Sequence, residues 1–497
     1  MVSNGYLSRG DKDEFNPQKW SSTASQLPKR SPDTYLNVLI VGAGLAGLIT
    51  ALECWRKGHN VVGILERSHG PVYTGDIIVI GPSAISTLHH WPDICRDLEE
   101  DQSDSAMYYR HHNGDLILGP TTLGYNSPEH LAQRQDLLYV APHQARRKFY
   151  RMLLRQVPRY FEDEVANVAG VVTEDGSVRV AQLVVAADAF KTRSDLLIAG
   201  DHVPTRSSGM SVYRAALPTE LALQDPAFKA RWGELVEKGG SNHEFWIGPG
   251  MHLGLFISPD IVAYGLTPRD KFLQPGGNEP TESWDPDVDP AEVLEVLHRV
   301  PDWNPAIEGL IRNTPKRATV HWPLLWRSLR QGWTSKGGRA VQVGDAAHTT
   351  VPASISGGTL AIEDAVTLAA CLQLACSGGT PGGARIYNLL RYQRVSCVQK
   401  MSFFNSENLG AVDMDEVLKK DPEKVKVRFS KWLFQHDPEA YVYEKYGQAF
   451  SHLVLGTDFE NTNFPPGHKF KMWTIKEIQA DILAGKKVAD LLDGDWD

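Results

Sequence analysis

One segment near the N-terminus limits the possible folds of this chain more than any other. Residues 36–66 read LNVLIVGAGLAGLITALECWRKGHNVVGILE. A short apolar run, a glycine-rich turn, a helical pattern and a second apolar run follow one another, and this order predicts a βαβ unit with parallel strands. Its expected parts are a strand over 36–41, the GxGxxG glycines Gly42, Gly44 and Gly47, a helix over 45–57, a strand over 61–65 and a terminal acid, Glu66.

The three glycines and the acid have separate roles in such a unit. Gly42 permits the tight turn, Gly44 lets the backbone approach a pyrophosphate, and Gly47 lets the helix pack on the sheet. The helix N-terminus presents unpaired N–H groups and a partial positive charge to the phosphates. Glu66 stands 19 residues after Gly47, where an acid accepts hydrogen bonds from an adenosine ribose. The segment is therefore expected to bind the ADP half of NAD or FAD, which share this motif.

A second motif, at residues 339–371, favours FAD. Residues 340–343 predict a strand followed by Asp345, and a helix with a buried apolar face is expected from Gly357. Asp345 is placed to bind a hydroxyl of the ribityl chain. The helix N-terminus at Gly357 and Gly358 is placed to support negative charge on a reduced isoalloxazine ring. A strand-end acid far along the chain from the first suits a long, extended cofactor.

The stretch GDAAHTTVPASISGGTLAIEDA, within this second motif, resembles the second flavin motif of the group A FAD-dependent aromatic hydroxylases. This is the family of p-hydroxybenzoate and salicylate hydroxylases, and the chain most resembles its fungal secondary-metabolism monooxygenases, over roughly residues 36–475. The resemblance implies that Arg146 matches an arginine on the flavin side of the site and that Pro352 fixes a loop beside the flavin ring. Arg67, next to Glu66, is a candidate for contact with adenine or a pyridine nucleotide phosphate, with an exposed arginine as the equal alternative. His348 is interpreted as structural.

Residues 183–193 read LVVAADAFKTR, and the valine-rich start predicts a buried strand before Asp188. The family carries the motif GADG here, whereas this chain has Ala186 and Ala189 in place of its two glycines. Each alanine adds one methyl group, which matters only where the backbone needs a positive φ or a close cofactor approach. Asp188 is therefore interpreted as a modified flavin contact, and nicotinamide docking is the step that the change affects.

The resemblance implies an α/β fold in which a Rossmann-like FAD-binding domain is interleaved with an antiparallel-sheet substrate domain. Strand-like runs at 210–217, 252–257 and 261–267 belong to the substrate domain, and the polar residues 274–291 predict an exposed loop. The expected segments are a polar N-terminal arm over 1–35, the FAD-binding domain over 36–110, 136–200 and 320–400, the substrate domain over 111–135 and 201–319, and a C-terminal helical extension over 401–497.

The resemblance also implies a monooxygenase. FAD reduced by the co-substrate NAD(P)H would add O2 to form a C4a-hydroperoxide, which would hydroxylate or epoxidise an aromatic, phenolic or polyketide-like small molecule in secondary-metabolite biosynthesis. A cation in a pocket of low dielectric constant would stabilise a substrate phenolate. Arg214 is the candidate, with an exposed strand arginine or structural ion pair as the alternative, and its neighbour Tyr213 faces the other way along the strand. His252 is a candidate base, or else a packed histidine.

Two other interpretations stay open. One is a flavoenzyme on the same scaffold that performs Baeyer–Villiger insertion or oxidative rearrangement. The other is a flavin-binding protein without turnover, for which the altered segment 186–189 is the support.

Composition argues against several other classes of protein. The net charge of -9 and the lack of a basic stripe argue against nucleic-acid binding. No apolar run reaches the length of a membrane span, and the polar first 35 residues lack the apolar core of a secretory signal. The five scattered cysteines form no CxxC pair, which suits a reducing compartment and argues against a metal site. We therefore expect a cytoplasmic protein, with its oligomeric state left open.

Overall fold

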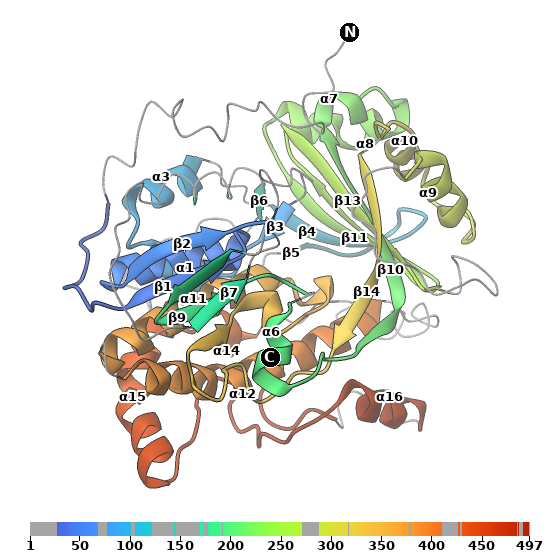
Figure 1. Ribbon diagram of the computed structural model, residues 1–497. Coiled ribbons are helices and arrows are strands. Elements are labelled where there is room, and N and C mark those ends of the chain that lie inside the picture. Colours follow the sequence, from blue (N-terminus) through green and yellow to red (C-terminus); the bar gives the residue numbers. More distant parts are fainter. Residues whose placement is uncertain are drawn as a thin grey trace.

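The computed structural model of the chain contains two large sheets with helices packed around them (Figure 1). The structure describes residues 27–67, 77–100, 105–121, 143–145, 149, 153, 169–172, 177–190, 192–270, 288–316, 318–376, 379–409, 426–427, 430–484, 486 and 491–496. Most of the N-terminal arm, and residues 274–287 of the expected exposed loop, lie outside the described residues.

The first sheet has four parallel strands in the order β15-β9-β1-β2. Strand β1 (Asn37–Val41) pairs with β2 (Asn60–Leu65) and with β9 (Leu183–Ala186), and β9 also pairs with β15 (Ala340–Gln342). The sequence predicted each of these strands, because a parallel strand covered on both faces shows up as a continuous apolar run. The carboxyl ends of β1, β9 and β15 lie at one edge of the sheet, so three segments distant in sequence deliver their turns to the same place.

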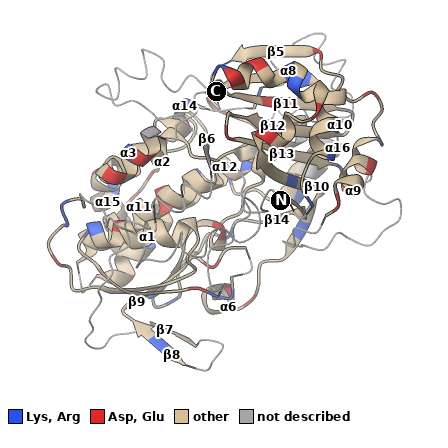
Figure 2. Ribbon diagram, turned by 90° about the horizontal axis from the view of Figure 1, so that it is seen from above, with Lys and Arg blue, Asp and Glu red and all other residues tan. Residues whose placement is uncertain are grey.

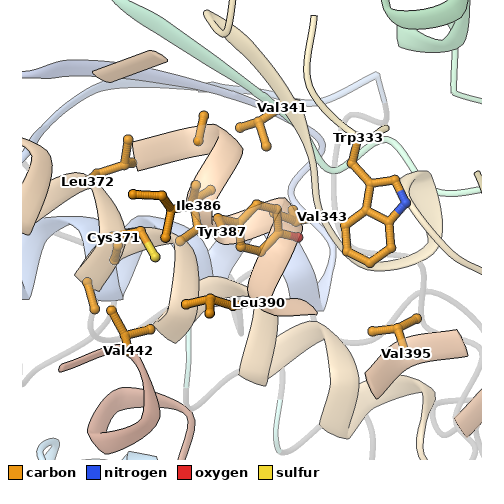
Figure 3. Packing of buried hydrophobic residues seen from close by; sticks show 14 of the residues in the cluster. Trp333, Val341, Val343, Cys371, Leu372, Ile386, Tyr387, Leu390, Val395 and Val442 are labelled. Atoms are coloured by element: carbon orange, nitrogen blue, oxygen red, sulfur yellow. The ribbon is translucent and has the colours of Figure 1, made fainter. Parts of the chain in front are cut away.

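Two helices fix this edge of the sheet. Helix α1 (Leu45–Arg56) follows the glycine-rich turn and ends before Gly58, whose φ of +86° requires a residue without a side chain. Helix α11 (Gly357–Ala375) packs against α1. Figure 3 shows the core beneath them, where strand residues Val341 and Val343 meet side chains of α11 and of the long helix that follows.

The second sheet has seven strands, in the order β14-β10-β13-β12-β11-β4-β5, and is mostly antiparallel. Its strands are β4 (Ala106–His111), β5 (Leu116–Thr121), β10 (Thr205–Pro218), β11 (Asn242–Gly248), β12 (Met251–Ile257), β13 (Ile261–Pro268) and β14 (Thr319–Arg327). The three strands expected in this region are confirmed as β10, β12 and β13. Figure 2 shows this sheet beside the first one, and β12 and β13 carry no charged residue.

Three helices cover the face of this sheet that points away from the first sheet. Each begins with a capping Asp or Asn followed by proline, which fixes its start. Trp232, Trp246 and Trp303 are buried between these helices and the strands. The helices are α8 (Pro226–Glu237), α9 (Pro290–Leu297) and α10 (Pro305–Arg312).

Strand pairing departs from the expected segment boundaries at two places. Residues 106–111 (β4) and 319–327 (β14) were assigned almost entirely to FAD-binding segments, yet both strands pair within the seven-stranded sheet. The pairing partners lie far away in the sequence, so no local pattern marks the change of sheet. The C-terminal end of β14, at Arg327, thus lies beside the strand-end turn after β15.

The remaining described elements are the C-terminal helices, two short strand pairs and four short helices. The C-terminal region is helical, as expected, and packs on the outside of the parallel sheet (Figure 1). Its helices are α12 (Thr380–Leu409), α14 (Lys431–Phe434), α15 (Pro438–Leu455) and α16 (Ile475–Leu483). Smaller elements are β3 (Ile77–Val79) paired with β6 (His143–Ala145), β7 (Ala169–Val172) paired with β8 (Val178–Ala181), and the helices α2 (Pro82–Leu88), α3 (Pro92–Glu100), α6 (Ser194–Ala199) and α7 (Thr219–Ala222). Among the described helices, only α11 has the length and apolarity of a membrane span, and most of it is buried inside the protein.

Candidate active site

The glycine-rich turn after β1 is closed by backbone contacts that exclude side chains at two positions. Gly42 has φ +103°, and a Cβ there would lie 2.3 Å from the carbonyl oxygen of Ala187. A Cβ on Gly47 would lie 1.9 Å from the carbonyl oxygen of Gly42. Both glycines are therefore needed for the turn and for helix packing.

Gly44 differs from its two neighbours in the motif. No atom of the described residues lies within 4 Å of the position that its Cβ would take, so the turn is open on the side where α1 begins. The Glu66 carboxylate accepts a hydrogen bond from the Ala43 backbone N–H at 2.9 Å, which holds the acid against this opening. Arg67 follows at the surface and is exposed. Free helix N–H groups and open space beside an acid are what a dinucleotide pyrophosphate and ribose require.

A second turn reaches the same edge after β15. Residues 344–346 form one turn of 3-10 helix in which Asp345 is exposed. The Asp364 carboxylate holds this turn, because it accepts hydrogen bonds from the Gly344 N–H at 2.9 Å and from Nε2 of buried His348 at 2.6 Å. His348 is therefore structural, as interpreted from the sequence, and its partner is a carboxylate.

Sequence reasoning missed Arg327, the last residue of β14. Its buried guanidinium pairs with the Asp195 carboxylate at 3.3 Å and donates to the carbonyl oxygens of Asp345 at 2.6 Å and Ala346 at 3.1 Å. Arg327 thus ties the seven-stranded sheet to the strand-end turns of the parallel sheet. A lone arginine in the stretch HWPLLWRSL carries no local signal for this role.

Beneath the second turn lies a fully buried ion cluster. Glu363 of α11 pairs with Arg391 at 2.6 Å and with Arg394 at 2.8 Å, and Asp364 pairs with Arg391 at 2.8 Å. Burial alone would raise the pKa of Glu363, but the two arginines outweigh it and hold that pKa well below its usual range. The spacing of the acids in the motif was visible in the sequence, whereas their arginine partners on α12 were not.

One cavity of about 500 Å³ joins these features to the second sheet. Gly44 and Asp345 line it at the parallel sheet, Gly357 and Gly358 at the start of α11, and the loop at Pro352 between them. On its other side lie side chains of β10, β11, β12 and β13. The cavity therefore runs from the dinucleotide turn to the predicted substrate sheet.

Arg214 and Tyr213 point to opposite faces of β10, as the alternation of a strand requires. Arg214 lines the cavity, and its Nη2 donates to the carbonyl oxygen of Ile77 on β3 at 3.3 Å. Its guanidinium also lies 5.8 Å from the ring centre of Trp322. Tyr213 is buried on the helix-covered side, where its hydroxyl donates to Glu292 at 3.2 Å. The structure therefore brings Arg214 and the two flavin motifs to one cavity.

His252 lines the same cavity from β12 and is buried. Burial, together with the positive charge of Arg269, lowers the pKa of His252 from 6.5 to about 4. Its Nδ1 is buried without a hydrogen-bond partner among the described residues. His252 is thus a neutral imidazole at physiological pH and suits hydrogen bonding to a ligand better than proton uptake.

The segment after β9 shows what the replacement of a glycine by Ala189 does to the backbone. Ala189 adopts the left-handed conformation with φ +63° and lines the cavity. Of the Asp188 carboxylate, one oxygen accepts from the Arg193 N–H at 3.3 Å, while Oδ1 is buried with no partner within the described part of the chain. The methyl group at position 189 therefore stands where the backbone favours glycine.

Taken together, these residues fit FAD. The open space at Gly44, the unpartnered oxygen of Asp188 and a cavity continuous from the α1 N-terminus to the α11 N-terminus match an extended dinucleotide with a planar ring.

Arg146 lies outside the described residues, so its predicted flavin contact stays a prediction. No group of three or more His, Cys, Asp or Glu side chains arranged for a metal ion occurs within the described ranges.

Comparison with known proteins agrees with this geometry. Residues 35–394 match the model of the FAD binding domain family. The chain belongs to the FAD-dependent monooxygenases. It is 82% identical over the full length of both chains to the FAD-dependent monooxygenase AacuC of Aspergillus aculeatus. It is also 65% identical, over 99% of both chains, to an FAD-dependent monooxygenase of Claviceps purpurea.

Several solved structures share the fold of this chain. FqzB superposes with a TM-score of 0.74 at 25% identity, over 88% of this chain and 99% of that one. CtdE in complex with FAD and a substrate gives 0.71 at 25% identity, over 84% of this chain and 99% of that one. A salicylate hydroxylase substrate complex gives 0.61 at 20% identity, over 82% and 97%, and shows the likeness of fold alone. The family and the α/β fold predicted from the sequence are thereby confirmed, as is FAD as the cofactor.

Proposed function

We propose that this monooxygenase uses NAD(P)H and O2 to hydroxylate or epoxidise an aromatic, phenolic or polyketide-like small molecule, in the cytoplasm, as a step of secondary-metabolite biosynthesis. Bound FAD would supply the redox chemistry, in which NAD(P)H is oxidised, one oxygen atom of O2 enters the substrate and the other leaves as water. Curated relatives that are 82% and 65% identical to this chain are fungal FAD-dependent monooxygenases, which supports the reaction class. The substrate class rests on the cavity itself.

The position of Arg214 is the observation that carries the proposal. It projects from β10, the second strand of the seven-stranded sheet, into the cavity that the flavin motifs also line, with apolar side chains around it. A guanidinium stays charged in such surroundings and attracts an anionic or strongly polarised oxygen. A phenol bound there loses its proton more readily, which makes its ring a better nucleophile toward an electrophilic oxygen.

The other predicted site residues take supporting roles in this proposal. Gly44 and the α1 N-terminus would face the pyrophosphate, Glu66 the adenosine ribose, and Asp345 the ribityl chain. The α11 N-terminus at Gly357 and Gly358, with Pro352 before it, would lie against the flavin ring. Arg67, Arg146 and Asp188 remain proposed contacts, and neutral His252 would donate to or accept from a second polar group of the substrate.

The test first measures how fast NADPH or NADH reduces the flavin bound to the purified protein. Anaerobic mixing with NADPH or NADH, with and without candidate phenols, should bleach the flavin absorbance, and the phenols should accelerate this. Arg214→Met should raise the KM for a phenol at least roughly tenfold, and Arg214→Lys should recover part of the loss. Arg206→Met is the matched control, because Arg206 lies on the same strand and is exposed. A flavin that neither nucleotide reduces, or a KM that Arg214→Met leaves unchanged, would contradict the proposal.

A further inference from the structure

Two glycines lie side by side on the cavity-facing side of the second sheet. Strand register pairs Arg214 of β10 with Gly265 of β13, Gly265 with Gly254 of β12, and Gly254 with Phe245 of β11. All four residues line the cavity. One row across four strands thus begins with a cation, continues over two residues without side chains and ends at an aromatic ring.

Neither glycine is required by its backbone. Both lie outside the positive-φ region in which glycine is favoured. A Cβ on Gly265 would come no closer than 3.6 Å to Cγ of Arg214, and a Cβ on Gly254 no closer than 3.9 Å to Cε1 of Phe245. These are ordinary van der Waals distances, so a methyl group at either position would fit without a clash in the protein.

Packing does not explain the glycines either. A glycine inside a strand costs roughly 0.5–1 kcal/mol relative to alanine and often marks the close approach of another molecule. The rows on both sides carry larger side chains, with Thr267 opposite His252 in one and Ala263 opposite Phe256 in the other. Gly254 is the one partly exposed residue of β12, whose other residues are buried. The missing side chains therefore leave a flat strip in an otherwise filled surface.

We infer that Gly254 and Gly265 are specificity-determining residues, which form the flat floor of the substrate site and admit a planar phenol of several fused rings. This inference rests on the proposed function and adds the width of the substrate to it. Two neighbouring strands give a floor about 10 Å across, which is wider than one benzene ring. The phenolic oxygen lies toward Arg214. The far ring reaches Phe245, whose own ring is stacked on Tyr109 at 5.4 Å between ring centres.

Charge and polarity along the floor fit the same ligand. Strands β12 and β13 contain no charged residue (Figure 2), so the strip between Arg214 and Phe245 favours an apolar ring face. His252 and His243 line the cavity beside the row, and burial lowers the pKa of each to about 4, which keeps both imidazoles neutral. A flat, apolar ligand with oxygen at one end thus meets the Arg214 cation at that end and no charged side chain along β12 and β13.

The experiment measures binding as a function of ring number. Phenol, naphthol and anthrol carry one hydroxyl on one, two and three fused rings, and calorimetric titration of the FAD-loaded protein gives a Kd for each. We expect the wild-type Kd to fall from phenol to anthrol. Gly254→Val should raise the anthrol Kd by roughly tenfold or more and the phenol Kd far less, because the valine side chain occupies the strip and leaves the Arg214 end open. Gly265→Ala should also raise the anthrol Kd more than the phenol Kd, by a smaller factor.

Gly447→Ala on α15 is the matched control, since no atom of the described residues lies within 4 Å of that Cβ either and the site is remote. Flavin content and melting temperature report whether each variant is folded. Equal changes for all three probes, or a wild-type Kd independent of ring number, would overturn the inference. Failure of the proposed function looks different: size-dependent binding would persist while no phenol accelerates flavin reduction by NAD(P)H.

Discussion

The Arg327 guanidinium donates a hydrogen bond from Nη2 to the carbonyl oxygen of Asp345 at 2.6 Å, and so the end of the seven-stranded sheet holds the turn that is proposed to bind the ribityl chain. The same side chain pairs with Asp195 in the segment after β9. Both strand-end segments at the cavity therefore depend on one buried cation. The contacts of Arg327 therefore link the geometry of the proposed flavin site to the position of the seven-stranded sheet.

Replacing this arginine should damage both stability and flavin retention. Arg327→Met leaves the Asp195 carboxylate buried without its partner, which typically costs about 3–5 kcal/mol in the free energy of unfolding. Urea unfolding and the FAD-to-protein ratio after gel filtration measure the two effects. Arg330→Met is the control, because its partner Asp201 is exposed and such surface pairs contribute about 0–1 kcal/mol. Equal losses in the two variants would show that Arg327 has no special role.

Substitutions at Gly44 and Gly47 in the glycine-rich turn should have different effects, one on flavin binding and the other on stability. Gly44→Val places a side chain in open space where the pyrophosphate is proposed to lie, so the protein should fold and elute without FAD. Gly47→Ala places a methyl group against the Gly42 carbonyl oxygen and should lower the free energy of unfolding by about 1–3 kcal/mol. Flavin absorbance and urea unfolding separate the outcomes. A Gly44→Val protein that retained its full flavin would rule out the pyrophosphate assignment.

Restoring a glycine after Asp188 should stabilise the protein. Ala189 has a positive φ, which costs an alanine about 1–2 kcal/mol, so Ala189→Gly is expected to increase the free energy of unfolding by up to about 1 kcal/mol. Ala186→Gly provides the contrast, because Ala186 is buried within β9 and a glycine there weakens the strand. Urea midpoints of the two variants should move in opposite directions, and a shift in the same direction would contradict the strain at position 189.

Stability should decrease below neutral pH because several histidines are buried as neutral imidazoles. Burial lowers the pKa of His59 from 6.5 to about 4, against the opposing hydrogen bond to the Ala369 carbonyl. The unfolded chain takes up a proton as the pH falls through 6.5, whereas the folded chain does so only near 4, so the contribution of neutral His59 is present above 6.5 and is lost toward 4. One such histidine lowers the free energy of unfolding by about 1–2 kcal/mol between about pH 7 and pH 5.

Urea unfolding at these two pH values measures the effect. His59→Gln should reduce the pH dependence, since glutamine keeps hydrogen-bonding capacity but takes up no proton. His298→Gln, at an exposed position, is the control for the exchange of histidine for glutamine itself. A wild-type stability that rises as the pH falls would contradict the assignment of His59 as neutral.

The sequence alone determined the parallel sheet and its cofactor edge. Continuous apolar runs marked β1, β9 and β15, and glycines at fixed spacing marked the turn before α1, because these features depend on neighbours within one segment. The positions of Glu66 and Asp345 after their strands followed in the same way. Alternation along β10 also placed Arg214 and Tyr213 on opposite faces correctly, because successive side chains of a strand point to opposite faces whatever its partners are.

Only the tertiary structure decided which distant residues meet. Strands β4 and β14 join the second sheet through partners far away in sequence, and Arg327 meets Asp345 and Asp195 because β14 ends beside the parallel sheet. The register that aligns Gly254 with Gly265 is likewise set by pairing between strands and has no signal within either strand. Local patterns determine which elements form, whereas packing between segments distant in sequence determines which side chains share a cavity.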